Sequence, residues 1–238
     1  MIDAVRTTVM TILNKDNNGF ITPDEFNAFA KQAQLELFED YFYDYNQALV
    51  NRNNRRNNSG YADIPRQLAE VIDTFTFVSG ALANVANVFT LPTDWYTLNT
   101  VLYQLSIEVE RVNQSEISKL ILSNITTPNT TYPAYTMNGA TASILGNKIT
   151  LYPTTIGVGD ITVNYVRYPV DPVWTYTTVG GNPIFNGTSG SYVDFELPKS
   201  DQANLVMKIL QYSGLTLRET DIVTVATANE LNTDKKES

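Results

Sequence analysis

The chain has 238 residues and a mass of 26.6 kDa, enough for one or two domains with a substantial hydrophobic core. Its composition is 43% apolar and 17% charged, which excludes a wholly disordered chain, and its net charge of -9 argues against a basic surface for nucleic acid. The chain contains neither Cys nor His. This removes disulfides, thiolate and imidazole metal sites, and Ser-His-Asp or Cys-His catalysis.

No stretch of the sequence approaches the roughly 20 consecutive apolar residues that a membrane helix needs. Residues 1–18 lack the charged and apolar regions of a signal peptide. The chain carries 24 Asn and 29 Thr, an excess of uncharged polar residues that suits strands and turns better than long exposed helices. We therefore expect a chain without membrane contact that is rich in strands and turns.

Helical periodicity dominates the first third of the chain. Apolar residues recur at helical spacing over 5–13 and again after a break rich in Gly and Asn. The second helix is predicted to begin with a capping box, because Thr22 can be the N-cap with Pro23 at N1 and Glu25 at N3. Its apolar face has nine members: Phe26, Phe29, Ala30, Ala33, Leu37, Phe38, Phe42, Tyr45 and Leu49. A third helix is expected over 64–75.

The hydrophobic period changes from about Val78. Short alternating segments separated by Gly and Pro predict strands. These segments are 77–78, 85–89, 103–111, 143–145, 148–152 and 160–167. Gly146-Asn147 is a hairpin signal, 115–122 predicts a short helix, and 94–96 predicts a turn. Short strands joined in this way predict an antiparallel sandwich or barrel.

A helix is predicted again after Leu197-Pro198, with Ser200 as its N-cap and Gly214 just beyond its C-terminus. This helix is apolar around much of its circumference, so it should be buried. A second C-terminal helix over 218–231 is weaker, because several of its residues are β-branched.

These patterns predict an α+β fold with a central antiparallel β-sandwich or barrel domain. The N-terminal and C-terminal helices should pack together, because the apolar C-terminal helix needs a partner face. The predicted organisation is an N-terminal helical region at 1–79, an antiparallel β domain at 80–199, C-terminal helices at 200–231 and a tail at 232–238.

Residues 14–25 fit the twelve-residue frame of an EF-hand calcium loop, with Gly19 at the position of the sharp turn. The five candidate calcium ligands are Asn14, Asp16, Asn18, the carbonyl of Phe20 and, as the bidentate ligand, Glu25. Asn rather than Asp at the first position lowers the ligand charge, and no second loop pairs with this one. The alternatives are a weak structural calcium site and an empty turn between two helices. No other cofactor is required.

Arg52, Arg55 and Arg56 lie in a polar loop and could contact the phosphates of a nucleic acid. The Asn residues between them and the lack of interleaved aromatic residues favour a solvated loop or a protein contact instead. The loop therefore does not by itself predict nucleic-acid binding.

Two further pairs of residues could carry chemistry. Asp194 and Glu196 would share one face of a strand and could form a carboxylate pair for glycoside hydrolysis, although a solvated or interface face is the favoured interpretation. Trp95 and Trp174 could form a platform for a sugar, but core and interface roles are more typical of such aromatic residues. We predict that the protein is not an enzyme.

Six segments follow one another along most of the chain and carry a resemblance. They are the N-terminal run 14–36, 89–96 (FTLPTDWY), 132–135 (YPAY), 148–153 (KITLYP), 165–174 (YVRYPVDPVW) and 194–198 (DFELP). Together they resemble virion structural proteins of crAss-like tailed bacteriophages, and the run 14–36 is similar to the opening of those proteins. No single segment is a chemical signature, and the weight lies in their order along most of the chain.

The resemblance implies a ring-forming protein of the head–tail connector or the tail, with no catalytic residues. It also implies a homo-oligomer, a ring of about twelve copies matching the usual portal symmetry. Its partners would be the portal and neighbouring ring or tail proteins. The genome would pass through the conduit without specific binding, and the protein would be made in the host cytoplasm and located in the virion.

Three other classes remain open. The main alternative is a carbohydrate-binding or host-attachment module of the virion, which glycan binding or a trimeric assembly would favour. A polysaccharide-cleaving enzyme without His would depend on Asp194 or Glu196. A generic calcium-binding protein would depend on the loop at 14–25.

Overall fold

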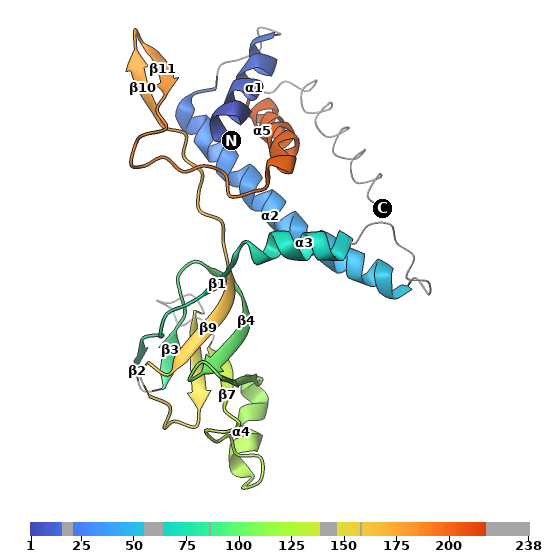
Figure 1. The fold of residues 1–238 in the computed structure, drawn as a ribbon, viewed down its shortest axis with the longest axis vertical. Coiled ribbons are helices and arrows are strands. Elements are labelled where there is room, and N and C mark those ends of the chain that lie inside the picture. The colour runs from blue at the N-terminus through green and yellow to red at the C-terminus, as the bar shows by residue number, and fades with distance from the viewer. Residues whose placement is uncertain (16–20, 55–63, 86, 139–146, 158, 218–238) are drawn as a thin grey trace. The chain divides into compact units, whose positions relative to one another are not determined.

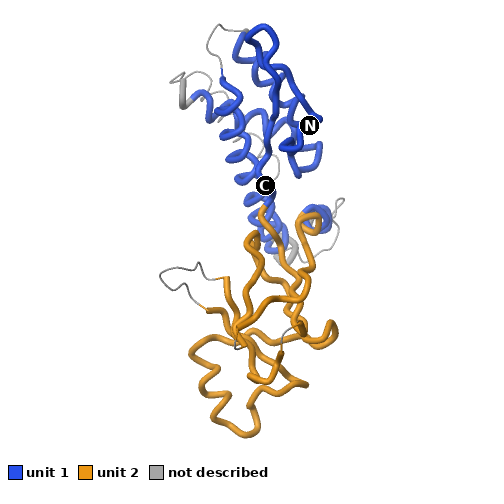
Figure 2. Tube along the Cα trace, turned by 90° about the vertical axis from the view of Figure 1, so that its left-hand side faces the viewer, with its two compact units in different colours: residues 1–71, 169–238 blue, residues 72–168 orange. Residues whose placement is uncertain are grey.

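The structure is a computed structural model that describes residues 1–15, 21–54, 64–85, 87–138, 147–157 and 159–217. It has the predicted α+β fold (Figure 1). The chain divides into two compact units, which Figure 2 distinguishes by colour. Unit 1 contains residues 1–71 and 169–238, and unit 2 contains residues 72–168.

Unit 1 is built on three helices, α1 (Ile2–Lys15), α2 (Pro23–Asn54) and α5 (Gln202–Leu217). α5 packs against both α1 and α2, so helices from the two ends of the chain share one core, as predicted (Figure 1). The largest contributions to this core come from fully buried apolar side chains on all three helices: Val5, Val9, Leu13, Phe26, Ala30, Phe38, Leu205 and Ile209. The helix α3 (Ile64–Asp73) leads from unit 1 toward unit 2 along the chain and ends two residues before the predicted limit.

The predicted capping box at the start of α2 is confirmed. The backbone amide of Glu25 donates to Oγ1 of Thr22 over 3.3 Å. In return, Oε2 of Glu25 accepts from the amide and the hydroxyl of Thr22, both at 2.8 Å. These bonds satisfy amide donors that have no partner within the helix, which fixes where α2 begins.

The predicted limits of the C-terminal helix are wrong at both ends. A short 3-10 turn, η1 (Lys199–Asp201), precedes α5, so Ser200 is not its N-cap. α5 also continues past Gly214, which is buried inside the helix. Gly costs a helix interior about 1 kcal/mol relative to Ala, so the burial of this segment outweighs its weak propensity. The predicted helix at 218–231 lies outside the described residues.

Residues 169–199, predicted to belong to the β domain, lie in unit 1. Two amide side chains seven residues apart on α2 hold this segment. Asn27 accepts a hydrogen bond from the amide of Trp174 over 2.8 Å and donates to its carbonyl over 3.3 Å. The buried Gln34 donates to the carbonyl of Val170 over 2.8 Å and accepts from the amide of Glu196 over 3.1 Å. The side-chain amides of Asn27 and Gln34 therefore satisfy backbone groups of this segment that would be bonded to a neighbouring strand in a sheet.

The same segment includes a two-stranded hairpin, β10 (Tyr176–Val179) and β11 (Asn182–Phe185). Its two-residue turn is Gly180-Gly181, whose φ angles are +59° and +85°. Positive φ at both positions is the mark of a type I′ turn, and glycine adopts it without steric cost. The hairpin forms a sheet of its own.

Unit 2 is a sandwich of two sheets. The first sheet has the order β1 (Thr76–Val78), β9 (Ile161–Arg167), β4 (Trp95–Tyr103), β5 (Ile107–Glu108). The second has the order β2 (Asn84–Val85), β3 (Val88–Thr90), β8 (Lys148–Tyr152), β7 (Ala134–Asn138), β6 (Glu110–Arg111). All pairs are antiparallel except β6 with β7.

The two sheets share one hydrophobic core. In β8, Ile149 and Leu151 are fully buried and alternate with partly exposed neighbours, the period of two expected for a strand with one face on a core. The main core residues come from both sheets: Phe89, Val101, Tyr135, Ile149, Leu151, Ile161 and Val163. The helix α4 (Gln114–Leu122), close to the predicted 115–122, packs Ile117 against Ala134 of β7.

Two predictions within unit 2 are wrong. Residues 103–111 were expected to form one strand, but Gln104 and Leu105 have φ angles of +50° and +61° and turn the chain between β4 and β5. Residues 94–96 were expected to turn, but Trp95 begins β4, which pairs along its length with β9. Alternation continues across the turn in the sequence, so periodicity alone does not reveal the break. The predicted strand 143–145 lies outside the described residues.

Candidate functional site

The predicted calcium loop lies mostly outside the described residues, because Asp16, Asn18 and Phe20 fall in the range 16–20. Asn14 is exposed on the last turn of α1. Glu25, the predicted bidentate ligand, instead holds the capping box, and the hydrogen bonds from Thr22 lower the pKa of its carboxyl. Within the described ranges, no group of three or more acidic side chains is gathered as a metal would require. Calcium binding stays a prediction.

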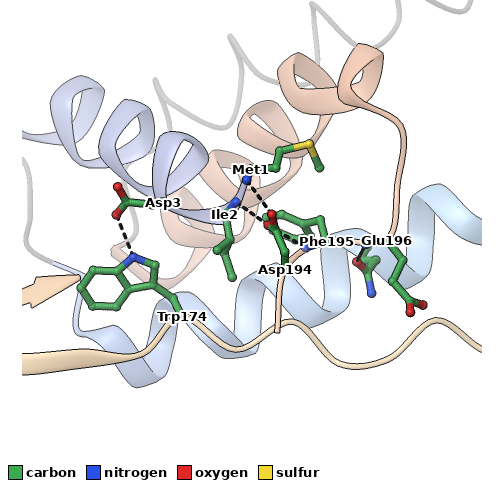
Figure 3. Close-up of polar contacts among 8 residues, drawn as sticks. Met1, Ile2, Asp3, Trp174, Asp194, Phe195 and Glu196 are labelled. Atoms are coloured by element: carbon green, nitrogen blue, oxygen red, sulfur yellow. Dashed lines mark hydrogen bonds and ion pairs between the residues drawn. The ribbon is translucent and has the colours of Figure 1, made fainter. Parts of the chain in front are cut away.

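Asp194 and Glu196 do not form the predicted pair on one strand face, since neither lies in a strand. Asp194 accepts hydrogen bonds from the amino group of Met1 and the amide of Ile2, both at 2.7 Å (Figure 3). Glu196 accepts from the amide of Val170 over 2.9 Å. Both carboxylates therefore have structural partners.

The position of Asp194 at the start of α1 has an electrostatic consequence. Burial alone would raise the pKa of this carboxyl, but the bonds from Met1, Ile2 and Phe195 outweigh it and hold the pKa below its usual value. A carboxylate at a helix N-terminus also interacts favourably with the helix dipole. The role of Asp194 is thus to attach α1 to the segment that precedes α5.

Trp174 is buried and cannot serve as an open platform for a sugar. Its indole nitrogen donates to Oδ1 of Asp3 over 3.0 Å (Figure 3), and the guanidinium of Arg6 lies 3.8 Å from the ring centroid. The ring stacks on Tyr176 and Phe185, the first residue of β10 and the last of β11. Trp174 therefore anchors the base of the hairpin to α1. Trp95 is partly buried against the core of unit 2.

A polar cluster joins α2 to α5. The ammonium of the buried Lys208 lies 3.0 Å from a carboxylate oxygen of Glu36 and 3.2 Å from one of Asp40. The hydroxyl of Tyr212 donates to Glu36 over 2.5 Å. Burial and this bond raise the pKa of Tyr212 to about 12. The carboxylates satisfy a lysine that would otherwise be costly to bury, so the cluster fixes how the two helices pack.

Exposed apolar side chains gather in three places in the described structure. The arm surface consists of Val179 and Ile184 on one face of the hairpin and Tyr176 on its other face. The edge surface consists of Phe77 and Val78, successive residues of the outer strand β1 that point to opposite faces of the sheet. The guanidinium of Arg167 lies 4.6 Å from the ring centroid of Phe77. The tip surface, at and after the end of α4, consists of Leu122, Ile125 and Tyr132, which are 86%, 95% and 77% exposed. Exposed apolar side chains that lie near one another in this way are candidates for interaction sites.

The three surfaces have one sequence property in common. Each lies in a segment without any Asp, Glu, Lys or Arg. These charge-free segments are 172–193 for the arm surface, 74–93 for the edge surface and 120–147 for the tip surface. Sequence reasoning missed this signal, which the printed sequence contains. It also missed the hairpin, whose Gly-Gly turn lies between two runs rich in β-branched and aromatic residues, a recognised signature.

The predicted apolar face of α2 includes Phe38, Phe42 and Tyr45, whose aromatic side chains could contribute to an interface if they were exposed. Phe38 is fully buried in the core of unit 1, with Phe42 edge-on against it at a centroid distance of 5.1 Å. Tyr43 is instead the exposed aromatic residue of this span. Of the basic loop, the side chains of Arg52, Arg55 and Arg56 lie outside the described residues.

Comparison with known proteins gives no family for this chain: no family model matches it, and no curated protein matches it. Among the described helices, none combines the length and the apolar character needed to cross a membrane. The candidate site is therefore defined by its own geometry, as three apolar surfaces in charge-free segments of the chain.

Proposed function

We propose that this protein is a structural protein of a tailed-phage virion, which forms a ring in the head–tail connector or tail as part of the conduit for the genome. The observation that carries the proposal is the presence of exposed apolar side chains in charge-free segments on both units. The resemblance of the ordered segments to virion proteins of crAss-like phages indicates which kind of assembly the protein belongs to. Neither the apolar surfaces nor this resemblance depends on catalytic residues.

A ring requires two different patches on each copy, one that contacts the preceding copy and one that contacts the next. The arm surface lies on unit 1, and the edge and tip surfaces lie on unit 2, so the chain carries different patches from which such a contact can be built. Aromatic and aliphatic anchors contribute most of the energy of an interface. This composition favours permanent assembly.

The charge of the chain also supports the proposal. At a net charge of -9, copies of this protein repel one another unless their contacts are free of like charges. The charge-free segments supply such contacts. An acidic conduit wall would in addition not bind the DNA that passes through it. The neighbours we propose are the portal and the adjoining ring or tail proteins.

The attachment-module alternative has less support, because the burial of Trp174 removes one of the two proposed sugar-stacking residues. Cryo-electron microscopy of the assembled particle tests the proposal directly. We expect about twelve copies in one ring on the portal axis, in line with a closed heterologous interface. Single copies, or trimers on fibres away from the axis, would overturn it.

A further inference from the structure

We infer that strand β10 of one copy pairs with strand β1 of the next copy, so that the hairpin extends the first sheet of its neighbour. The inference deepens the proposed function and rests on it only in taking the neighbour to be a second copy. In this contact the arm surface of one copy binds the edge surface of the next. The tip surface is not part of this contact.

The hydrogen-bonding pattern of the hairpin shows which edge is open. Val179 pairs with Asn182 across the turn, and the amide of Asn186 donates to the carbonyl of Thr175 over 2.9 Å. In an antiparallel ladder, bonded and non-bonded pairs alternate, so the backbone groups of Tyr176 and Thr178 point away from β11. Among the described residues they have no backbone partner. The outer edge of β10 is thus available to another strand.

The other edge of the hairpin is blocked. Pro183 stands opposite Thr178, at a position where the backbone nitrogen of β11 points outward. Proline has no amide hydrogen, and its ring excludes a further strand from that edge. The hairpin therefore accepts a strand only along β10. Because Pro183 closes the β11 edge and leaves the β10 edge open, a partner strand can add to one side of the hairpin only.

The outer edge of β1 has the same arrangement. The amide of Ser79 donates to Val163 over 2.8 Å, and the amide of Arg167 donates to Phe75 over 3.0 Å. These bonded pairs place Thr76 and Val78 at the alternate positions, with their backbone groups pointing away from β9. β1 is the end strand of its sheet, and Val78 is 67% exposed. β1 therefore has two residues with outward backbone groups, as β10 does, and the two edges can pair.

The distribution of charge is consistent with a second copy as the occupant, which the proposed function supplies. β10 and β1 lie in charge-free segments of an acidic chain, so neither strand brings a carboxylate of its own to the contact. Strand addition supplies main-chain hydrogen bonds, and the flanking Val78, Val179 and Tyr176 supply apolar contact. An exposed pair of unprotected strand edges is otherwise an aggregation hazard. Pairing the two edges with each other removes both hazards in one assembly.

Two proline variants test which edge is used. Thr178→Pro closes the β10 edge at a position not bonded within the hairpin, where proline is tolerated. Pro183→Thr opens the β11 edge and is the matched control. We expect Thr178→Pro to weaken self-association of the full chain, measured by sedimentation, about tenfold or more. Pro183→Thr leaves the β10 edge intact and should not weaken self-association, and equal weakening by the two variants would overturn the inference.

Cross-linking tests the partner strand, and the absence of Cys from the chain makes each introduced thiol unique. Thr178→Cys and Val78→Cys are made in separate, differently tagged full-length chains, mixed and treated with a short bismaleimide. We expect a mixed dimer, and no more than background when Leu122→Cys replaces Val78→Cys. No mixed dimer at the concentrations where the chain associates would overturn the inference. So would cross-linking only within one chain when both cysteines are placed together.

The outcomes for the contact and for the proposed function are separable. A mixed dimer from a protein that is absent from the portal axis of the particle would support the strand contact and overturn the ring. Rings on the axis without the cross-link would support the proposed function and overturn the strand contact. Electron microscopy of the cross-linked sample distinguishes closed rings from open chains.

Discussion

Unit 1 and unit 2 differ in how many of the contacts between their elements are made by polar side chains. In unit 1, charged and amide side chains cross between elements: Lys208 reaches two carboxylates, Gln34 holds two backbone groups, and Asp194 holds the start of α1. In unit 2, the two sheets meet through an apolar core. Of the buried side-chain polar atoms without a hydrogen-bond partner among the described residues, Nε of Arg6 lies in unit 1, and the others, including the hydroxyls of Thr136 and Thr162, lie in unit 2.

The packing of unit 1 is specified largely by polar contacts, and the packing of unit 2 is specified largely by the shape of its apolar core. The polar contacts of unit 1 join segments far apart in sequence and permit one arrangement of the helices, because an unpaired buried charge or amide is costly. The core of unit 2 depends on volume and on alternation along its strands. Unit 1 should therefore respond to single polar changes and to pH, and unit 2 to changes in volume.

The largest expected effect is a cavity in unit 2. Phe89→Ala removes a fully buried ring from the shared core and should destabilise unit 2 by about 3–5 kcal/mol. Hydrogen exchange measured peptide by peptide should show the loss in residues 72–168. Val85→Ala, at an 82% exposed position, is the control and should change stability by less than about 0.5 kcal/mol. An equal loss of protection across unit 1 would contradict the comparison.

The next effect is on the buried lysine of unit 1. Lys208→Ala removes a buried ammonium with two carboxylate partners and should cost about 2 kcal/mol, measured by denaturant unfolding. The matched control is Lys31→Ala, because the pair Lys31–Asp171 is shorter, at 2.7 Å against 3.0 and 3.2 Å for Lys208, but both of its side chains are more than half exposed. Its loss should cost less than about 0.5 kcal/mol. Similar losses of unfolding free energy in both variants would show that the burial of Lys208 does not strengthen its ion pairs.

The elements that could be predicted are those set by local signals. The capping box fixed the start of α2, and the clean alternation of 148–152 identified β8. Limits that depend on burial could not be predicted. Gly214 is a good helix terminator by local propensity, yet α5 continues through it because the helix is packed in the core of unit 1.

The contacts of the candidate site were predictable only in part. The Gly180-Gly181 turn and the charge-free segments are visible in the sequence. The bonds of Asn27 and Gln34 join residues 147 and 136 positions apart, and no local pattern distinguishes such amides from surface residues. The hairpin could thus be found from its turn, whereas its attachment to α1 and α2 required the structure.

A third prediction concerns the cap of α2. Thr22→Ala removes the acceptor for the amide of Glu25 and should lower the stability of unit 1 by about 1 kcal/mol. Thr22→Ser keeps the oxygen and is the control. Hydrogen exchange in the first turn of α2 is the measurement, and unchanged exchange in Thr22→Ala would contradict the role of the cap.

A fourth prediction tests calcium at the same turn. The few formal charges of the loop predict a Kd on the order of millimolar for calcium, measured by calorimetry. Glu25→Gln keeps a residue suited to the capping box but removes the charge of the proposed bidentate ligand, so it should abolish the heat of binding. The absence of calcium heat from the unchanged protein would leave only the empty turn.

The smallest expected effect is the pH dependence of unit 1 through Asp194. The folded state lowers the pKa of this carboxyl, so its contribution to stability is present above the unfolded value of about 4 and is lost as the pH falls toward the folded value. The carboxyl is partly exposed, which limits the effect to a few tenths of a kcal/mol. Asp194→Asn keeps the shape of the side chain but does not titrate, so the difference in stability between the two proteins should shrink as the pH falls from 5 to about 3. Hydrogen exchange in α1 follows this difference directly, and the core of unit 2 in the same sample is the internal control. If the difference between the two proteins does not change over this range, Asp194 holds α1 through hydrogen bonds alone, and the charge of the carboxylate does not contribute.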